Sequence, residues 1–518
     1  MARKAGVGEN RTAGRRRRLL IVGSLLLLAV LLAAALLWKP FTDGVPVRYQ
    51  DDTEHFKYGS IGSEASSGIP YWAWQALPRL FPEDFAGRSD YKAFGFLYER
   101  DGKGRQRDLP IGISRRNYQG IDMVWFNCAV CHVGTWRTDA AGQPQIVPGM
   151  PSNNLEFGGF IKFLLGKAAL DPRMAPKGQV WGAQQAGAGF GPVRRLFWGN
   201  IVAPRLREGL INQRSMLLPL VDWQSPWGQG RVDTFNPYKL LKFEIPFNQL
   251  ADSERVGTSD FPAIFHQRPR EGMELHWDGN NTSLMERNLS AAIGAGVTPK
   301  TVDIPALQRV ANWLKDLKPP PSPIRPDPAA VARGRLLYGQ ACAACHGYQK
   351  GADYVFSGQW LGKVTPIEAV ATDRNRLDSY TQRFRDRQVS EIFRGTPYAF
   401  RHFTKTNGYA NQPLDGLWLR APYLHNGSVP TLAALLDPPE RRPVTYVRGL
   451  DIVDHQNGGF VAPGCDPAAR RPLPRAPVGQ RLLCFDTRIR GNGNGGHLYG
   501  TALAPDAKAD LLAYLKTF

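Results

Sequence analysis

The longest apolar run in the chain extends from Leu19 to Trp38 and follows a strongly basic start. Twenty helical residues at about 1.5 Å each span roughly 30 Å, the thickness of the hydrocarbon layer of a bilayer. We therefore expect residues 19–38 to form a transmembrane anchor. Seven basic residues and one acidic residue precede the run, so the positive-inside rule predicts residues 1–18 as a cytoplasmic basic tail.

A cleaved signal peptide is the alternative interpretation of this run, with residues 33–35 (Ala-Ala-Ala) as the small-residue cleavage site. The mature chain would then begin with Leu36, Leu37 and Trp38, an apolar start that favours a retained anchor. Both interpretations export the rest of the chain. We expect a single-pass protein of the bacterial inner membrane with its main body in the periplasm, or a secreted protein if the signal is cleaved.

Aromatic residues and prolines crowd the next region, residues 39–110, and are densest between Ile69 and Pro82. Closely spaced prolines oppose a long helix. The pattern therefore predicts an irregular extension that packs on a core. An aromatic patch at the entrance to an access channel is the alternative.

Several later segments have the periodicity of regular elements. Residues 121–127 are apolar and β-branched, which is typical of a strand rather than a helix. Residues 304–317 and 506–516 each place apolar side chains on one helical face. A further helix is expected to begin at Pro328, with Asp327 as its N-cap, and to pack on the helix at 506–516.

The sequence C-x-x-C-H occurs twice, at residues 128–132 after the predicted strand and at residues 342–346 after the helix expected from Pro328. This sequence attaches c-type haem: its thiols bond to the porphyrin vinyl groups and its histidine binds the iron. With 6 cysteines and 9 histidines in 518 residues, two accidental copies are expected roughly once in a million chains. We predict two covalently attached haems c, with a zinc site or a redox dithiol as the alternative. The binding residues are Cys128, Cys131, His132, Cys342, Cys345 and His346.

The haem motifs divide the exported part into two domains joined by a proline-rich linker at residues 319–327. The N-terminal haem domain is expected at residues 111–318 and the C-terminal cytochrome c domain at residues 328–518. With 41 prolines and 54 glycines, the chain should contain much irregular structure. We predict a mainly α fold with extensive irregular loops, in which two cytochrome c-like haem domains follow an N-terminal transmembrane helix.

The second axial ligand decides whether a haem iron transfers electrons or binds small molecules. No methionine follows position 285, so the C-terminal haem cannot take a methionine ligand from its own domain. Among the histidines of that domain, His497 lies in a glycine-rich segment that would let the backbone approach a flat ligand. We predict His497 as this distal ligand, with His425 as the alternative.

No residue is singled out as the distal ligand of the N-terminal haem, and an open position agrees equally well with the sequence. An open position is what dioxygen or peroxide needs on iron. The candidate ligands are Met150, Met216, Met273, Met285, His266 and His276.

Cys465 and Cys484 remain after the haem cysteines are assigned. In an exported protein two leftover thiols usually pair, because the compartment is oxidising. We predict a disulfide between them, with two free thiols as the alternative.

The net charge of +20 includes +6 from residues 1–18 (seven bases minus one acid), so the exported part keeps +14. A basic surface can bind nucleic acid, but the chain has no base-reading motif and export removes that target. We therefore expect no nucleic-acid partner. Anionic lipid headgroups or an acidic redox protein are the expected partners, and a merely soluble basic surface is the alternative.

Three segments outside the haem motifs contribute to a family resemblance: residues 275–281 (LHWDGNN), 419–430 (LRAPYLHNGSVP) and 493–500 (GNGGHLYG). With the motifs, they resemble the di-haem cytochrome c peroxidase superfamily, and most closely its branch of rubber oxygenases and di-haem fatty-acid dioxygenases. The resemblance covers about residues 60–518. In the rubber-cleaving members a phenylalanine lies near the reactive haem, whereas the corresponding stretch here, residues 290–294, reads SAAIG.

The resemblance implies a reactive N-terminal haem with His132 as proximal ligand. It also implies a C-terminal haem that transfers or tunes electrons, with His346 and His497 as its axial pair. Trp277 would then be the tryptophan between the haems. A core tryptophan is the alternative role, since the chain has 13.

The sequence thus predicts a haem-dependent oxidoreductase. The resemblance favours an oxygenase that uses dioxygen on an unsaturated lipid or isoprenoid, and the aromatic extension favours an enclosed apolar site. One alternative is a peroxidase that reduces hydrogen peroxide with electrons from a redox partner cytochrome. The other is an electron-transfer cytochrome without substrate chemistry.

Overall fold

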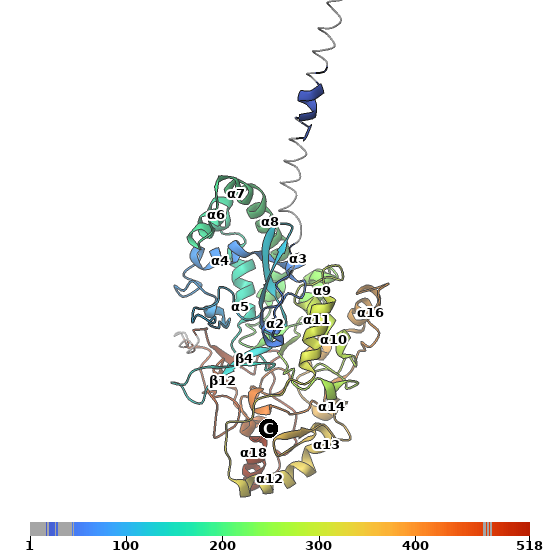
Figure 1. Cartoon of the computed structure of the whole chain (residues 1–518). Coiled ribbons are helices and arrows are strands. Elements are labelled where there is room, and N and C mark those ends of the chain that lie inside the picture. The colour runs from blue at the N-terminus through green and yellow to red at the C-terminus, as the bar shows by residue number, and fades with distance from the viewer. Residues whose placement is uncertain are drawn as a thin grey trace, which may run out of the picture.

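The computed structural model describes residues 17, 20–25, 27, 28, 44, 46–469, 473, 476 and 479–518. Figure 1 shows an elongated body with α6 (Pro176–Gln185) and α7 (Pro192–Phe197) at one end. The other end holds α12 (Pro328–Ala341) and α18 (Pro505–Leu515). The described strands form one three-stranded and five two-stranded sheets, joined by long irregular stretches. The fold is therefore mixed helix and sheet, and the prediction of a mainly α fold is wrong, because many loops close into short antiparallel hairpins.

The remaining elements are as follows. The other helices are α2 Asp52–Tyr58, α3 Glu64–Ser67, α4 Tyr71–Leu80, α5 Phe157–Ile161, α8 Ala203–Trp223, α9 Asn236–Lys242, α10 Leu284–Gly294, α11 Ile304–Leu314, α13 Ala343–His346, α14 Ile367–Val370, α15 Asn375–Ser379, α16 Gln382–Glu391 and α17 Leu432–Leu435. The strands are β1 Ile69–Pro70, β2 Ile113–Tyr118, β3 Ile121–Phe126, β4 Val133–Trp136, β5 Gln145–Pro148, β6 Arg231–Asp233, β7 Thr258–Asp260, β8 Tyr348–Lys350, β9 Asp353–Val355, β10 Val364–Pro366, β11 Gly408–Ala410, β12 Thr445–Arg448 and β13 Leu483–Asp486.

Most of the predicted membrane anchor at residues 19–38, including the alternative cleavage site, lies outside the described residues. The described part, residues 20–25, 27 and 28, is helical and exposes apolar side chains. Within the part of the chain that the structure describes, no helix is both long enough and apolar enough to cross a membrane. Of the predicted basic tail, only Arg17 is described.

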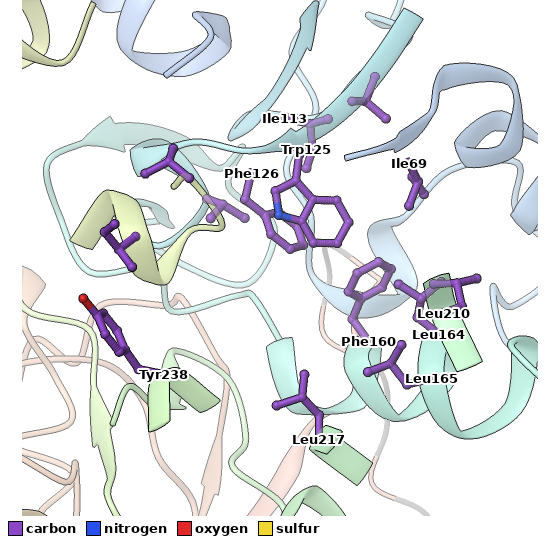
Figure 2. Packing of buried hydrophobic residues seen from close by; sticks show 14 of the residues in the cluster. Ile69, Ile113, Trp125, Phe126, Phe160, Leu164, Leu165, Leu210, Leu217 and Tyr238 are labelled. Atoms are coloured by element: carbon purple, nitrogen blue, oxygen red, sulfur yellow. The ribbon is translucent and has the colours of Figure 1, made fainter. Parts of the chain in front are cut away.

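The strand predicted before the first haem motif is confirmed as β3. It forms the centre of the three-stranded sheet, with β1 and β2 on either side in antiparallel register. Figure 2 shows how side chains of β3 lie in the core next to the helix that contains Phe160. The Phe126 and Phe160 rings are 6.1 Å apart, and both side chains are buried. Residues that lead directly into Cys128 are thus fixed in the largest hydrophobic core of the described chain.

The prediction of an irregular extension is wrong for Tyr71–Leu80, which form the ten-residue helix α4. Pro78 lies inside this helix and has no N–H to donate to the carbonyl of Trp74, four residues earlier. The hydroxyl of Tyr91 donates to that carbonyl instead, at 2.6 Å, and the Tyr91 ring stacks on Trp74 at 3.8 Å. Trp74 is completely buried, so the aromatic residues here are core rather than an exposed patch.

The helix pair predicted around the second haem motif is confirmed as α12 and α18. The Asp327 carboxylate accepts from the Ala330 N–H at 2.9 Å, as expected of an N-cap. The two helices approach so closely that a side chain at Gly334 would meet the Asp510 carbonyl at 1.9 Å. This crossing explains why position 334 holds glycine. The predicted helix at 304–317 is α11, which ends earlier, at Leu314.

The predicted linker at residues 319–327 is held against the body. The Trp418 indole donates to the Pro320 carbonyl at 3.1 Å, and Ser322 is buried. A buried ion pair between Arg137 and Asp451 also joins the two halves, at 2.9 Å. The segment therefore connects two halves that share an interface rather than two free domains.

Cys465 and Cys484 form a disulfide that closes a loop of 19 residues beside β12 and β13. Replacing both residues with serine should lower the free energy of unfolding by about 3 kcal/mol, because the open chain gains entropy when it unfolds. Denaturant unfolding measures this difference, and haem absorbance serves as the control because neither residue belongs to a haem motif. An unchanged unfolding midpoint would contradict the prediction.

Candidate functional site

The first haem motif begins where β3 ends, and Asn127 fixes its turn. The Asn127 side-chain oxygen accepts from the Ala129 N–H at 3.0 Å, which caps the short helix η3 (Cys128–Val130). Its amide nitrogen donates to the carbonyl of Gly59 at 3.0 Å. Asn127 is buried, so these bonds are shielded from water. The motif is therefore held between the central strand and the segment after α2.

His132 is oriented by a backbone carbonyl. Its Nδ1 lies 3.0 Å from the Pro262 oxygen. A carbonyl can only accept, so Nδ1 carries the proton and Nε2 keeps its lone pair. Exclusion of water lowers the pKa of His132 to about 4, so the imidazole is neutral at pH 7. A neutral imidazole whose other nitrogen donates to a carbonyl is the usual form of a metal-binding histidine.

The thiols of the first motif are not those of a redox dithiol. Burial raises the pKa of Cys128 to about 11 and that of Cys131 to about 12. Catalytic C-x-x-C pairs need a lowered thiol pKa, because the thiolate is the nucleophile. These thiols are neutral at pH 7, which disfavours the dithiol alternative.

The second motif follows α12, and its histidine is oriented in the same way. His346 Nδ1 lies 2.7 Å from the Gln412 carbonyl, so Nε2 again keeps its lone pair. Burial lowers the pKa of His346. The Tyr354 hydroxyl accepts from the Leu414 N–H at 2.8 Å and donates to the His346 carbonyl. These contacts tie the second motif to residues 412–414.

His497 lies opposite His346, with the two ring centroids 6.3 Å apart. Its Nδ1 is buried and has no hydrogen-bond partner among the described residues, and burial lowers its pKa to about 4. Two imidazoles that share one metal ion at about 2.0 Å each have ring centroids roughly 6 Å apart, since each nitrogen is about 1.1 Å from its centroid. The spacing and the donor set of Cys342, Cys345, His346 and His497 fit a haem c with two nitrogen ligands.

The glycine before His497 has a different role from the one predicted. A side chain at Gly496 would meet the backbone of Ala371 at 2.4 Å, and the His497 N–H donates to the Val370 carbonyl at 2.8 Å. Gly496 thus allows its segment to approach the C-terminal end of α14 closely. That contact in turn sets the position of the His497 ring.

His425, the alternative ligand, is engaged by other protein groups. Its ring stacks on Tyr409 at 4.1 Å, and its Nε2 lies 3.0 Å from the Tyr409 oxygen. The Tyr409 hydroxyl donates its single proton to the Asp373 carbonyl at 2.7 Å, so the histidine must donate. Its Nε2 lone pair is therefore not free for a metal, and the geometry favours His497.

The six candidate ligands of the N-terminal haem are dispersed. His266 Nδ1 pairs with Asp415 at 2.9 Å, and His276 Nδ1 lies 2.6 Å from the Asn280 side-chain oxygen. Met150 is buried in the core of the C-terminal half, Met273 packs against Gly362, Met285 lies against the largest core and Met216 lies on α8. The contacts of the described residues single out none of them as a ligand.

Arg287 was not predicted from the sequence. It lies on α10, the helix that contains residues 290–294, and its guanidinium donates to the side-chain oxygens of Gln267 at 2.6 Å and Asn288 at 2.9 Å. Burial lowers its pKa to about 10, so it is still charged at pH 7. Its charge lowers the pKa of both Cys128 and His132, so it acts electrostatically on the first motif. A cation bonded here to neutral amides suits an anionic group of a haem or of a substrate.

Three short segments connect the two motif histidines. Pro262 accepts from His132, and two residues earlier the Asp260 carbonyl accepts from the Trp277 indole at 2.8 Å. The Trp277 carbonyl accepts from the Ala410 N–H at 2.8 Å. Residues 410–412 then lead to the carbonyl that holds His346. Trp277 is thus part of a path of hydrogen bonds and short covalent segments that joins the two motifs.

Gln412 is a second residue that sequence reasoning missed. Its carbonyl accepts from His346, while its side-chain amide donates to the His276 carbonyl at 3.0 Å. One residue therefore contacts the second motif and the neighbour of Trp277. No local pattern marks such a role, because a backbone carbonyl is present at every position.

Gln412→Ala should shift the midpoint potential of the C-terminal haem and lower the free energy of unfolding by about 1–3 kcal/mol, since it leaves the His276 carbonyl without its donor. Spectroelectrochemical titration and denaturant unfolding measure the two effects. Gln308→Ala is the control, because that amide donates to the Asn312 side-chain oxygen on the exposed face of α11. Equal potentials in both variants would show that the Gln412 side chain does not influence the second motif, whose histidine is held by the Gln412 backbone carbonyl.

Comparison with known proteins agrees with a cytochrome c-like haem site. A family described as RoxA-like, cytochrome c-like matches residues 408–447, which contain Gln412 and His425. The chain is 39% identical over 560 residues to the uncharacterized protein y4iJ of Sinorhizobium fredii (strain NBRC 101917 / NGR234), covering 86% of this chain and 87% of that protein. It is 30% identical over 287 residues to the uncharacterized protein y4iM of the same strain, covering 50% of this chain and 64% of that protein. The chain therefore belongs to the family of y4iJ, and its RoxA-like cytochrome c domain identifies it as a haem-dependent oxidoreductase with covalently bound haem c.

Proposed function

We propose that the chain is a membrane-anchored periplasmic di-haem oxygenase. The N-terminal haem would act with dioxygen on an unsaturated lipid or isoprenoid, and the C-terminal haem would transfer electrons. The observation that carries the proposal is the difference between the two motif histidines. His346 has a second imidazole at 6.3 Å, whereas the aromatic neighbour of His132 is Phe261 at 6.5 Å. Two nitrogen ligands would leave no position for substrate on the second iron, so small-molecule chemistry falls to the first.

The residues of each site have distinct roles in this proposal. Cys128 and Cys131 would attach the first haem, and His132, held by the Pro262 carbonyl, would bind its iron. At the second haem the thiols are those of Cys342 and Cys345, and the axial pair is His346 and His497. When bound, the haem iron supplies the dioxygen and one-electron chemistry.

Arg287 and Trp277 would complete the machinery. The half-buried Arg287 guanidinium would fix an anionic group, such as a fatty-acid carboxylate, and would thereby orient the chain of the substrate. Trp277 lies in the connection between the motifs and would let electrons pass between the haems. The inter-haem role of Trp277 rests on the family resemblance and on its hydrogen bond to Asp260.

A di-haem peroxidase that reduces hydrogen peroxide is the second candidate. The hydrogen-bonded connection through Trp277 supports it, because a peroxidase must deliver electrons from a partner cytochrome to the reactive iron. The two functions differ in what they consume. The oxygenase should take up dioxygen with an olefin and no external reductant in each turnover, whereas the peroxidase needs peroxide and reduced cytochrome.

Oxygen-electrode assays separate the two candidates. We expect dioxygen uptake by the holoprotein with linoleate, oleate or polyisoprene alone. The parallel assay supplies hydrogen peroxide and reduced cytochrome c. Arg287→Gln should raise KM for the fatty acids and leave that for polyisoprene unchanged, since only the acids have a carboxylate. Peroxide turnover without dioxygen uptake on any olefin would replace the oxygenase with the peroxidase.

A further inference from the structure

We propose that the helices at the end of the molecule distant from the second haem motif form a surface that docks on an anionic lipid bilayer. This docking surface consists of α6, α7, the following helical segment η6 (Trp198–Val202) and the first turn of α8. Figure 1 shows α6 and α7 at the end opposite α12. The inference is independent of the reaction that the haems catalyse.

The docking surface exposes large apolar side chains that the fold does not use. Val193 is 79% exposed, Leu196 66%, Trp181 51% and Ile201 40%. The inward side chains of the same helices already form a core, in which Trp198 is buried and packs on other elements. The outward residues are therefore not required for packing. Four large apolar side chains on neighbouring helices mark an interaction surface rather than scattered exposure.

The charge of the docking surface selects the partner. Between residues 176 and 207 the sequence contains five basic residues and no acidic residue. Lys177 on α6, Arg194 and Arg195 on α7 and Arg205 in the first turn of α8 are exposed. Tryptophan and aliphatic residues flanked by arginine and lysine are the composition of surfaces that lie in the headgroup region of a bilayer. Anionic headgroups would neutralise the excess positive charge.

The place where the chain after the apolar run joins the body supports a bilayer as the partner of the docking surface. The Gly44 N–H donates to the Asn117 carbonyl at 3.1 Å, so the chain from the apolar run at 19–38 joins the body at the end of β2. Ile121, just across the hairpin turn, packs against the core of the docking surface. A membrane that held the apolar run would therefore lie next to these helices. The second haem motif, at the far end, would then face the aqueous phase.

A fluorescent label can measure the depth of this surface in the full-length holoprotein. Leu196→Cys and Leu336→Cys each introduce a thiol for a nitrobenzoxadiazole label, and Leu336 is the matched control because it is 71% exposed on α12 at the opposite end. The protein is reconstituted in phosphatidylcholine vesicles with or without phosphatidylglycerol. We expect blue-shifted emission and several-fold stronger quenching by doxyl lipids at position 196 than at 336.

The same assay contains the results that would overturn the proposal. Arg194→Glu with Arg195→Glu should abolish the effect of phosphatidylglycerol on the label at 196 and leave haem content unchanged. Equal exposure of both labels in every vesicle would exclude docking. Shielding of position 196 that is as strong in detergent micelles as in vesicles would assign the surface to a protein partner or a second copy of the chain.

Discussion

Replacing Cys128 with alanine is expected to remove one of the two proposed haems and to leave the other in place, and Cys342→Ala should do the same at the second motif. Each motif supplies its own pair of thiols and its own histidine, oriented by a different carbonyl, from Pro262 or Gln412. A haem that loses its covalent attachment is no longer retained in a denatured chain. Iron per chain should fall from two to one.

Covalent haem staining and the pyridine haemochrome spectrum of the purified protein measure this loss. The double variants Cys128→Ala/Cys131→Ala and Cys342→Ala/Cys345→Ala remove both thiols of a motif and extend the test. Cys465→Ser is the control, because that cysteine is in the disulfide and should leave both haems bound. Two haems in both double variants would disprove the attachment sites.

Elements set by local chemistry were predictable from the sequence. Asp327 as N-cap and Pro328 directly after it specify the start of α12, and these two residues are neighbours in the sequence. β3 follows from the apolar and β-branched character of residues 121–127, which is typical of a strand. In contrast, the prolines do not predict α4. Pro78 leaves the Trp74 carbonyl without its helical N–H donor, and the Tyr91 hydroxyl replaces that donor. The Tyr91 ring also stacks on Trp74, and both contacts depend on the tertiary fold.

The site divides in the same way. The six residues proposed to bind haem lie close together in sequence within each motif, so spacing alone reveals them. The carbonyls that orient the two histidines come from positions 130 and 66 residues away and carry no side-chain signal. Arg287 could have been suspected only as one of many basic residues, because its half-buried position and its hydrogen bonds to the side-chain oxygens of Gln267 and Asn288 appear only in three dimensions.

His497→Ala is expected to open the C-terminal haem to external ligands. In the proposed arrangement two imidazoles hold this iron, and their ring spacing of 6.3 Å leaves no room for a further ligand between them. Alanine removes one nitrogen donor without replacing it. Imidazole stabilises the ferric iron, so the wild-type haem should have a low midpoint potential. The variant loses one imidazole and should therefore have a higher midpoint potential.

Carbon monoxide titration of the reduced protein counts open iron positions. We expect one carbon monoxide per chain in the wild type, at the N-terminal haem, and two in His497→Ala. His425→Ala is the matched control: it removes a buried histidine that stacks on Tyr409, so it should destabilise the fold but keep one carbon monoxide per chain. A second carbon monoxide in His425→Ala, with none gained in His497→Ala, would move the ligand to His425. A wild type that binds no carbon monoxide would mean that both irons are saturated, and the chain would then be an electron carrier rather than an oxygenase.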